Sequence, residues 1–583
     1  MSSSRLSSRI ALFVVLALAG CDASSAPPDA FAPGDASTAP DARTSPDAFV
    51  AHDAGTDAAT VPDAATAPDA ATAPDAASDD DAAVVVETDA YVAPDAYVPS
   101  APPSVTLTSP RDGIGIFARR IHVTGTASDD VAVASVTIAI GTGTATPVTL
   151  DASGAFAIDL VPVLGENVVH VTATDAESQS TSASTTVHFG HRVSGGNSQG
   201  AYIDLDGVLH TWGRNELGQL GNGTLQGSAY GDGASATLPV RYEPAGTEGV
   251  VSVVTRQTFT IALRDDEHML TWGSNSDGQL GYAAETDCGT TATSPCRRSP
   301  TVVPGLEDIV QIAAGFQHVL ALREDGTVVS WGQNERGELG YVTDANGDQT
   351  TPAAVPGLTD IVQVAAGSTH SLALTGDGHV YVWGDNQYGI LGNGTNDTAV
   401  HATPLLVDGV DGVVALAASN SSVLALRDDG TVLSWGRNNN GQIGNGTSGT
   451  ALVSTPVVVL TDATTPLDHV ESIAADGFVS LAVTTEGAAY AWGWGFLGQL
   501  GMGTLPSGDR DLANRTFAAP VPGSGDGDLV LLEIETGAGG PTFALTTHGN
   551  LVGWGWSFNG SLGIAGAIQS WAYSSPVLVY PIP

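Results

Sequence analysis

Two cysteines, Cys288 and Cys296, have a spacing that suits thiol chemistry. They lie eight positions apart in one polar stretch of the chain. Two thiols at this spacing can form a local disulfide bond, or they can serve as a metal-binding or redox pair. No histidine lies near them to complete a metal site. The sequence therefore predicts a disulfide bond, provided that the chain reaches an oxidising compartment.

The first residues indicate export to such a compartment. Arg5 and Arg9 are followed by an apolar run over residues 10–18, which is too short to span a bilayer. The run ends in Leu-Ala-Gly-Cys, a motif that resembles the lipobox of bacterial lipoproteins. The resemblance implies a signal peptide over residues 1–21, a lipid on Cys21 and attachment to the bacterial envelope, at the outer membrane or cell surface rather than the inner membrane. An ordinary secretory signal with a coincidental cysteine is the alternative.

The composition excludes several classes of chemistry. The chain contains no lysine, which rules out a Schiff-base lysine and a P-loop lysine. Its net charge of −44 disfavours nucleic acid as a partner, because phosphate binding needs cations. The sequence holds no Gly-x-Ser-x-Gly elbow with triad partners, no His-Glu-x-x-His motif and no Cys/His cluster, so we expect neither an enzyme nor a cofactor or metal site.

Two segments precede the main part of the chain. Residues 22–102 repeat Pro-Asp-Ala and carry few large apolar side chains, so they predict a disordered acidic linker. Residues 103–190 contain short runs of alternating polar and apolar residues separated by turn formers, which predicts a small β-sandwich. This segment resembles bacterial immunoglobulin-like domains, which often act as spacers. Its aspartates, Asp129, Asp130 and Asp175, are expected to cap turns, with calcium binding as the weaker alternative.

Residues 191–583 form a repeat array with a constant internal phase. In each copy a Gly-x-(Leu/Ile)-Gly tetrad begins six residues after the tryptophan of a Trp-Gly pair. In most copies an acidic residue followed by glycine forms a turn five residues before the same tryptophan. The seven tryptophans are Trp212, Trp272, Trp331, Trp383, Trp435, Trp492 and Trp554. Their spacing of 52 to 62 residues, with several short strands in each unit, predicts one propeller blade per repeat.

The run Trp-Gly-x-Asn-x-x-Gly-Gln-Leu-Gly-x-Gly over residues 212–223 resembles the RCC1-type repeat. The resemblance covers residues 191–583 and implies an all-β fold with a seven-bladed propeller. A Gly-x-x-His pattern of that family is kept only at His318 and His370, so we interpret these histidines as packing or turn-bonding residues. A proline-led strand, Pro576–Val579, follows the last tetrad, and we expect it to complete the first blade and so clasp the ring.

The function predicted from these features is that of a non-enzymatic surface scaffold. It would bind a protein or other surface macromolecule through propeller loops, as a monomer that touches the membrane only through its lipid. The alternatives are a propeller enzyme acting on polysaccharide or peptide and a guanine-nucleotide exchange factor, the activity that named the family. Insertions at residues 225–239, 282–299, 447–454 and 504–519 provide the candidate anchors, since aromatic and arginine side chains dominate interfaces. These anchors are Tyr230, Tyr282, Arg297, Arg298, Arg510 and Arg515.

Overall fold

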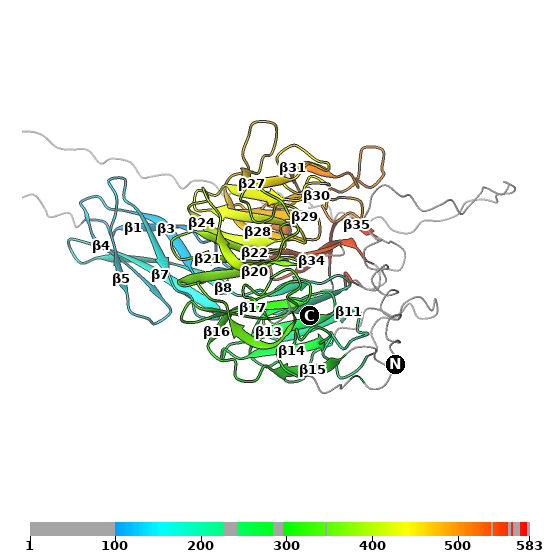
Figure 1. Ribbon diagram of the computed structural model, residues 1–583. Helices are drawn as coiled ribbons and strands as arrows, with labels where there is room; N and C mark the ends of the chain where they lie inside the picture. Colours follow the sequence, from blue (N-terminus) through cyan, green and yellow to red (C-terminus); the bar gives the residue numbers. More distant parts are fainter. Residues whose placement is uncertain are drawn as a thin grey trace, which may run out of the picture. The chain divides into compact units, whose positions relative to one another are not determined.

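The computed structural model describes the sandwich and the propeller and shows that both are built of β-strands (Figure 1). The described residues are 100–225, 242–283, 288, 295–343, 347–537, 540–557, 561–563 and 572–579. Their single helical element is a short 3-10 helix, Gly527–Leu529. None of these residues forms a helix long and apolar enough to cross a bilayer. The predicted signal peptide and nearly all of the predicted linker lie outside the described residues.

The predicted β-sandwich is confirmed as two facing sheets. One sheet contains β1 (Ser104–Ser109), β3 (Ile121–Ser128) and β6 (Ala155–Leu160). The other contains β2 (Ile114–Ile116), β8 (Ser180–Phe189), β7 (Gly165–Asp175), β4 (Val133–Ile140) and β5 (Thr146–Val148), in that order. Alternate residues of β3 and β7 are buried between the sheets, which is the pattern that the alternating sequence predicts.

The predicted seven blades are also confirmed, as seven separate sheets coloured from green to red in Figure 1. Within the described residues the first blade has three strands, β9 (Val193–Gly195), β10 (Gln199–Ile203) and β11 (Leu209–Gly213), and Tyr242 forms an isolated antiparallel bridge with Thr211 of β11. The next three blades are β12 (Val250–Thr255), β13 (Phe259–Arg264), β14 (Met269–Ser274) and β15 (Cys296–Val302); β16 (Ile309–Ala314), β17 (His318–Arg323), β18 (Val328–Gly332) and β19 (Gln349–Ala354); and β20 (Ile361–Ala366), β21 (His370–Thr375), β22 (Val380–Gly384) and β23 (His401–Leu406). The last three are β24 (Val413–Ala418), β25 (Ser422–Arg427), β26 (Val432–Gly436) and β27 (Val453–Val458); β28 (Val470–Asp476), β29 (Val479–Thr484), β30 (Ala489–Gly493) and β31 (Arg515–Pro520); and β32 (Leu531–Thr536), β33 (Pro541–Thr546), β34 (Leu551–Trp556) and β35 (Ala572–Leu578).

The repeated tryptophan joins each blade to the one before it. All seven side chains are fully buried. Each indole Nε1 donates a hydrogen bond to a tetrad carbonyl of the preceding blade; Trp435, for example, donates to the Ile390 carbonyl at 2.7 Å and Trp272 to the Gln219 carbonyl at 2.9 Å. The ring closes by the same contact, because Trp212 of the first blade donates to the Ser561 carbonyl of the last blade at 3.0 Å. The contact between Trp212 and Ser561 thus joins the first and last of the seven blades.

The prediction that the C-terminal strand completes the first blade is wrong. β35 pairs with β34 and is the fourth strand of the seventh blade. The reason lies in the order of strands: each proline-led strand follows its own tetrad and returns to pair with the tryptophan strand just before it, as β19 does with β18. The ring therefore closes through side chains of the first and last blades, including Tyr202, Trp212, Phe543 and Val579, and not through a shared sheet.

Candidate functional site

The loops of the propeller fall into two groups that lie at opposite faces of the ring. Neighbouring strands of a blade are antiparallel, so the turn after the first strand and the loop after the third share one face. We call this the open face; in the third blade it holds Gly315–Gln317 and the loop from Gln333. The hairpin between the second and third strands, such as Glu324–Thr327, lies at the other face.

The sandwich covers this second face, which we call the capped face. Three arginines of the sandwich bind its loops and strand starts. The Arg119 guanidinium donates to the Glu324 carbonyl, and Arg120 donates to the Gly376 carbonyl at 2.9 Å. Arg111 donates to the Glu471 carboxylate at 2.7 Å. These contacts reach three different blades, so they hold the sandwich across the mouth of the ring.

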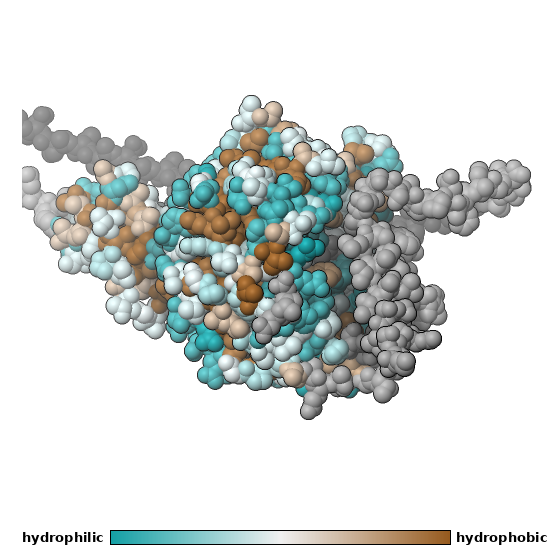
Figure 2. All heavy atoms as spheres, viewed as in Figure 1, coloured by the Kyte–Doolittle hydropathy of each residue, from teal (hydrophilic) through white to brown (hydrophobic). Residues whose placement is uncertain are grey.

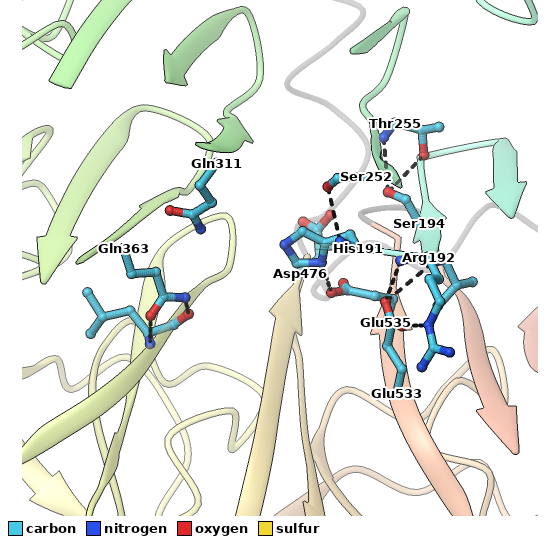
Figure 3. A network of polar contacts seen from close by, with 12 residues as sticks. His191, Arg192, Ser194, Ser252, Thr255, Gln311, Gln363, Asp476, Glu533 and Glu535 are labelled. Atoms are coloured by element: carbon cyan, nitrogen blue, oxygen red, sulfur yellow. Dashed lines mark hydrogen bonds and ion pairs between the residues drawn. The ribbon is translucent and has the colours of Figure 1, made fainter. Parts of the chain in front are cut away.

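Phe117, between β2 and β3, closes the central channel on the capped side. Its ring stacks on His191, with centroids 4.1 Å apart and planes 7° apart, and His191 Nδ1 lies 3.1 Å from a Glu535 carboxylate oxygen. Beside it, Arg192 Nε donates at 3.3 Å to Glu533, whose side chain is fully buried. Figure 3 shows His191, Arg192, Glu533 and Glu535 close together at the channel wall. Burial raises the pKa of Glu533, and the Arg192 guanidinium opposes that shift.

Arg256 crosses the channel at its open-face end. Its guanidinium donates to the carbonyls of Ala314 and Ala366 and forms an ion pair with Asp476, which comes from the sixth blade. Burial raises the pKa of Asp476, and Arg256 opposes this. Between Phe117 and Arg256 a cavity of about 80 Å³ remains, lined largely by short side chains of the inner strands. A cavity of this volume does not admit a peptide or an oligosaccharide chain.

The predicted partner-binding residues are only partly placed as surface anchors. Tyr230 lies outside the described residues. The prediction that Tyr282 is an exposed anchor is wrong, because its side chain is buried. Its hydroxyl donates to the Thr271 carbonyl at 3.4 Å, and the Arg297 guanidinium carbon lies 5.8 Å from its ring centre. Tyr341 holds the same position after the next tetrad and donates to the Ser330 carbonyl at 2.9 Å. The tyrosine after a tetrad is thus a packing residue of the blade.

The other candidate arginines lie at the margin of the open face. Arg297 and Arg298 are half-buried at the start of β15, and Arg515 begins β31, where it pairs with the Asp511 carboxylate. Arg510 is exposed on the loop before β31. The structure therefore does not gather the five described candidates into one site.

A row of side chains on the open face, which the sequence analysis missed, forms a more continuous surface. It runs through Tyr388, Arg437, Phe478, Trp494 and Phe496, from the fourth to the sixth blade. Phe496 is 65% exposed, and the other four are half-buried. Figure 2 shows that hydrophilic residues cover much of the propeller in that view, with hydrophobic residues in small groups between them. The sequence contains a pattern that could have predicted part of this row. Trp494 and Phe496 lie two and four residues after the tryptophan of their blade, at positions where the other blades carry mainly polar residues.

The two histidines of the Gly-x-x-His pattern are packed inside the blades. His318 and His370 are fully buried, His318 Nε2 lies 3.0 Å from the Ser371 hydroxyl, and burial lowers the pKa of each to about 3. Within the described ranges, no group of three or more histidine, cysteine, aspartate or glutamate side chains could hold a metal ion. The sandwich aspartates Asp129 and Asp175 accept hydrogen bonds from nearby backbone amides, as turn residues do.

The two cysteines of the second blade are joined in the structure. Cys288 and Cys296 form a disulfide bond, with Cα atoms 5.7 Å apart. Both are buried where β15 begins. Cys21, the predicted site of lipid attachment, lies outside the described residues.

Comparison with known proteins agrees with this architecture. The profile of the RCC1-like domain family matches residues 163–517, and the profile of glucodextranase domain B matches residues 103–191. The Arabidopsis thaliana ultraviolet-B receptor UVR8 is 27% identical over 382 residues, which cover 65% of this chain and 79% of the receptor. The human E3 ubiquitin-protein ligase HERC2 is 31% identical over 308 residues, 51% of this chain but only 6% of HERC2. The crystal structure of human WBSCR16 shows the same fold at 23% identity and a TM-score of 0.51, covering 64% of this chain and 94% of that one. With its seven tryptophan-linked blades and a family match over more than half of its length, this chain belongs to the RCC1-like domain family.

Proposed function

We propose that this protein is a non-enzymatic scaffold that binds another protein through the open face of its propeller. The observation that carries the proposal is the contrast between the two faces. The sandwich arginines Arg111, Arg119 and Arg120 occupy one face, whereas the other presents a row of aromatic side chains and an arginine. Aromatic and arginine side chains provide most of the binding energy in protein interfaces.

The closed channel supports binding over catalysis. Arg256 and Phe117 fill its two ends, and the carboxylates at its wall pair with cations within the ring, as Asp476 does with Arg256 and Glu533 with Arg192. These groups are engaged in holding the ring together. An acid, base or nucleophile facing a substrate-sized cleft would instead support the enzyme alternative.

The remaining parts of the chain fit display at a surface. In this proposal a lipid on Cys21 anchors the protein in the bacterial envelope, and the acidic linker over residues 22–102 holds the folded part away from the membrane. The protein acts as a monomer and does not bind nucleic acid, because its net charge of −44 opposes phosphate binding. The sandwich contributes as a cap on the propeller in addition to any role as a spacer.

Site-directed photo-crosslinking in native cell envelopes tests the proposal. A photoreactive phenylalanine analogue replaces either Asn439 on the open face or Asp429 on the capped-face hairpin of the same blade; both residues are exposed. We expect the Asn439 position to yield a discrete crosslinked protein and the Asp429 position to yield none. The same crosslinked protein from both positions, or turnover of a glycan or peptide by the purified chain, would contradict the proposal.

A further inference from the structure

The row on the open face is fixed by contacts between its own members. The Arg437 guanidinium carbon lies 4.7 Å from the ring centre of Tyr388 and 5.1 Å from that of Phe478. Phe478 meets Trp494 edge to face, with centroids 6.3 Å apart. Trp494 and Phe496 are stacked 6.5 Å apart, with only 11° between their planes. Five side chains from three blades are therefore held in place before any ligand arrives, which lowers the entropy that a ligand must overcome.

Arg437 is a cation without a carboxylate in a strongly acidic chain. Aspartate and glutamate number 63 against 19 arginines, yet no ion pair within the described residues involves Arg437. Its Nη2 donates to the side-chain oxygen of Asn439 at 3.1 Å once that amide is oriented to satisfy both of its polar atoms. Arg214 holds the same position after the first blade's tryptophan and, by contrast, pairs with the Glu216 carboxylate at 2.5 Å.

The placement of Arg437 suits recognition of an anion. A guanidinium packed against ring faces keeps its charge, and arginine is a preferred partner of carboxylates. Phe478 links Arg437 to the rings of Trp494 and Phe496, which offer apolar area farther along the row. A charged contact and an apolar contact thus lie in a fixed order along one row.

We propose that this row receives a segment of a partner protein in which an aromatic or large aliphatic side chain stands next to an aspartate or glutamate. The apolar side chain packs on Trp494 and Phe496, and the carboxylate pairs with Arg437. Charge complementarity carries the choice of a carboxylate, since Arg437 has no intramolecular counterion among the described residues. The inference rests on the proposed function and deepens it, because it names the chemistry of the partner.

Selection of short displayed peptides of random sequence on the full-length protein tests this inference. We expect the enriched peptides to share an apolar residue within two positions of an acidic one. The best peptide and its Asp→Asn or Glu→Gln counterpart are then titrated by fluorescence anisotropy. The wild-type protein should bind the acidic peptide about tenfold more tightly, as expected for a charged contact at an interface centre.

Variants of the row separate the two contacts. Arg437→Gln should abolish the preference for the acidic peptide, and Arg437→Lys should keep part of it. Phe496→Ala should weaken both peptides about tenfold without changing their ratio. Two matched controls should leave both affinities unchanged: Arg214→Gln, at the equivalent repeat position, and Phe316→Ala, a 39% exposed phenylalanine on the open face of the third blade. Circular dichroism of each variant confirms that the fold is retained.

Several outcomes would overturn the inference. These are enrichment of basic peptides, an acidic preference that survives Arg437→Gln, or no enrichment over a protein carrying both Arg437→Gln and Phe496→Ala. Competition by uronic-acid oligosaccharides at lower concentrations than the acidic peptide would assign the row to a glycan instead. If crosslinking still placed the partner at Asn439 while the row variants bound normally, the proposed function would stand and this inference alone would fail.

Discussion

The repeated tryptophan near the end of the third strand of each blade is both a packing side chain and a hydrogen-bond donor. Trp435 shows the second role clearly: its Nε1 donates to the Ile390 carbonyl at 2.7 Å, across the boundary between two blades, and the side chain is fully buried. A buried carbonyl that loses its donor suffers a desolvation penalty. The indole nitrogen is therefore as important to the ring as the indole surface.

Replacing Trp435 by phenylalanine isolates the hydrogen bond. Much of the ring packing is kept, but the Ile390 carbonyl loses its donor, so we expect the free energy of unfolding to fall by about 1–3 kcal/mol. Trp435→Ala should lower it by about 3–5 kcal/mol, because a cavity is added. Urea denaturation of the three proteins measures both effects. Equal stabilities for wild type and Trp435→Phe would show that the hydrogen bond contributes nothing.

Glu338 is the acidic member of a position that holds glutamine in four other blades, Gln219, Gln279, Gln442 and Gln499. Burial raises the pKa of Glu338 from 4.5 to about 7, and the nearby Glu335 and Asp348 carboxylates add to the shift. Because the folded-state pKa is the higher one, folding favours the protonated form. The stability that Glu338 contributes is present below about pH 4.5 and is lost as the pH rises through about 7.

Glu338→Gln should therefore stabilise the protein at high pH and change little in acid. At pH 8 we expect a gain in the free energy of unfolding of up to about 3 kcal/mol, falling toward zero near pH 4. Thermal or urea denaturation across this range measures the difference. A gain that is constant with pH would mean that ionisation of Glu338 is not its cause.

The sequence predicted the buried repeat positions of the blades better than it predicted the exposed residues of the loops. The phase of Trp, Gly and Leu predicted buried residues at every blade, since the fold repeats the same environment seven times. Exposure within an insertion could not be read in this way. Tyr282 was expected at the surface, but its side chain is buried and bonds to the Thr271 carbonyl of the same blade. The reason is that the position directly after the tetrad belongs to the repeat and not to the insertion. The row around Arg437 was missed because its members are distant in sequence and meet only when three blades are adjacent.

The sandwich and the propeller are connected by specific polar contacts. Arg120 donates to the Gly376 carbonyl at 2.9 Å and to the Val413 carbonyl at 3.3 Å, and its guanidinium lies 3.6 Å from Asp159 of the sandwich itself. Strand periodicity predicted both domains. It could not predict this interface, because nothing in a local pattern indicates which loops of one domain bind the other.

Arg120→Ala tests whether the cap is held by these contacts. We expect faster amide hydrogen exchange in the loops around Gly376 and Val413, since the carbonyls there lose their donor and become more solvated. Exchange within β7 and β8, which pair with each other over most of their length, should be unchanged. His122→Ala, a half-exposed sandwich residue that contacts Asp159, serves as the control. Unchanged exchange in both loops would show that Arg120 does not hold the cap.

An acidic segment over residues 22–102 precedes the folded part of the chain, and none of the described residues forms a helix that could cross a membrane. The lipid anchor on Cys21 remains a prediction. Cys21→Ser should move the protein from the detergent phase to the aqueous phase in a detergent partition experiment. Mass spectrometry of the mature wild-type protein provides the direct check, and a Cys21 without lipid would refute the anchor.

The arrangement of the blades has a consequence for how the chain folds as it is made. Each blade uses strands that are contiguous in sequence, and six of the seven tryptophan contacts join residues only 45 to 55 positions apart. The contact from Trp212 to Ser561, which spans 349 positions, is the exception. Blades can therefore form one after another as the chain emerges, and no early blade has to wait for a strand from the far end. The ring closes in a single late step, in which the finished first and last sheets dock. A duplicated or deleted repeat would add or remove a complete sheet without leaving a strand of a neighbouring blade unpaired.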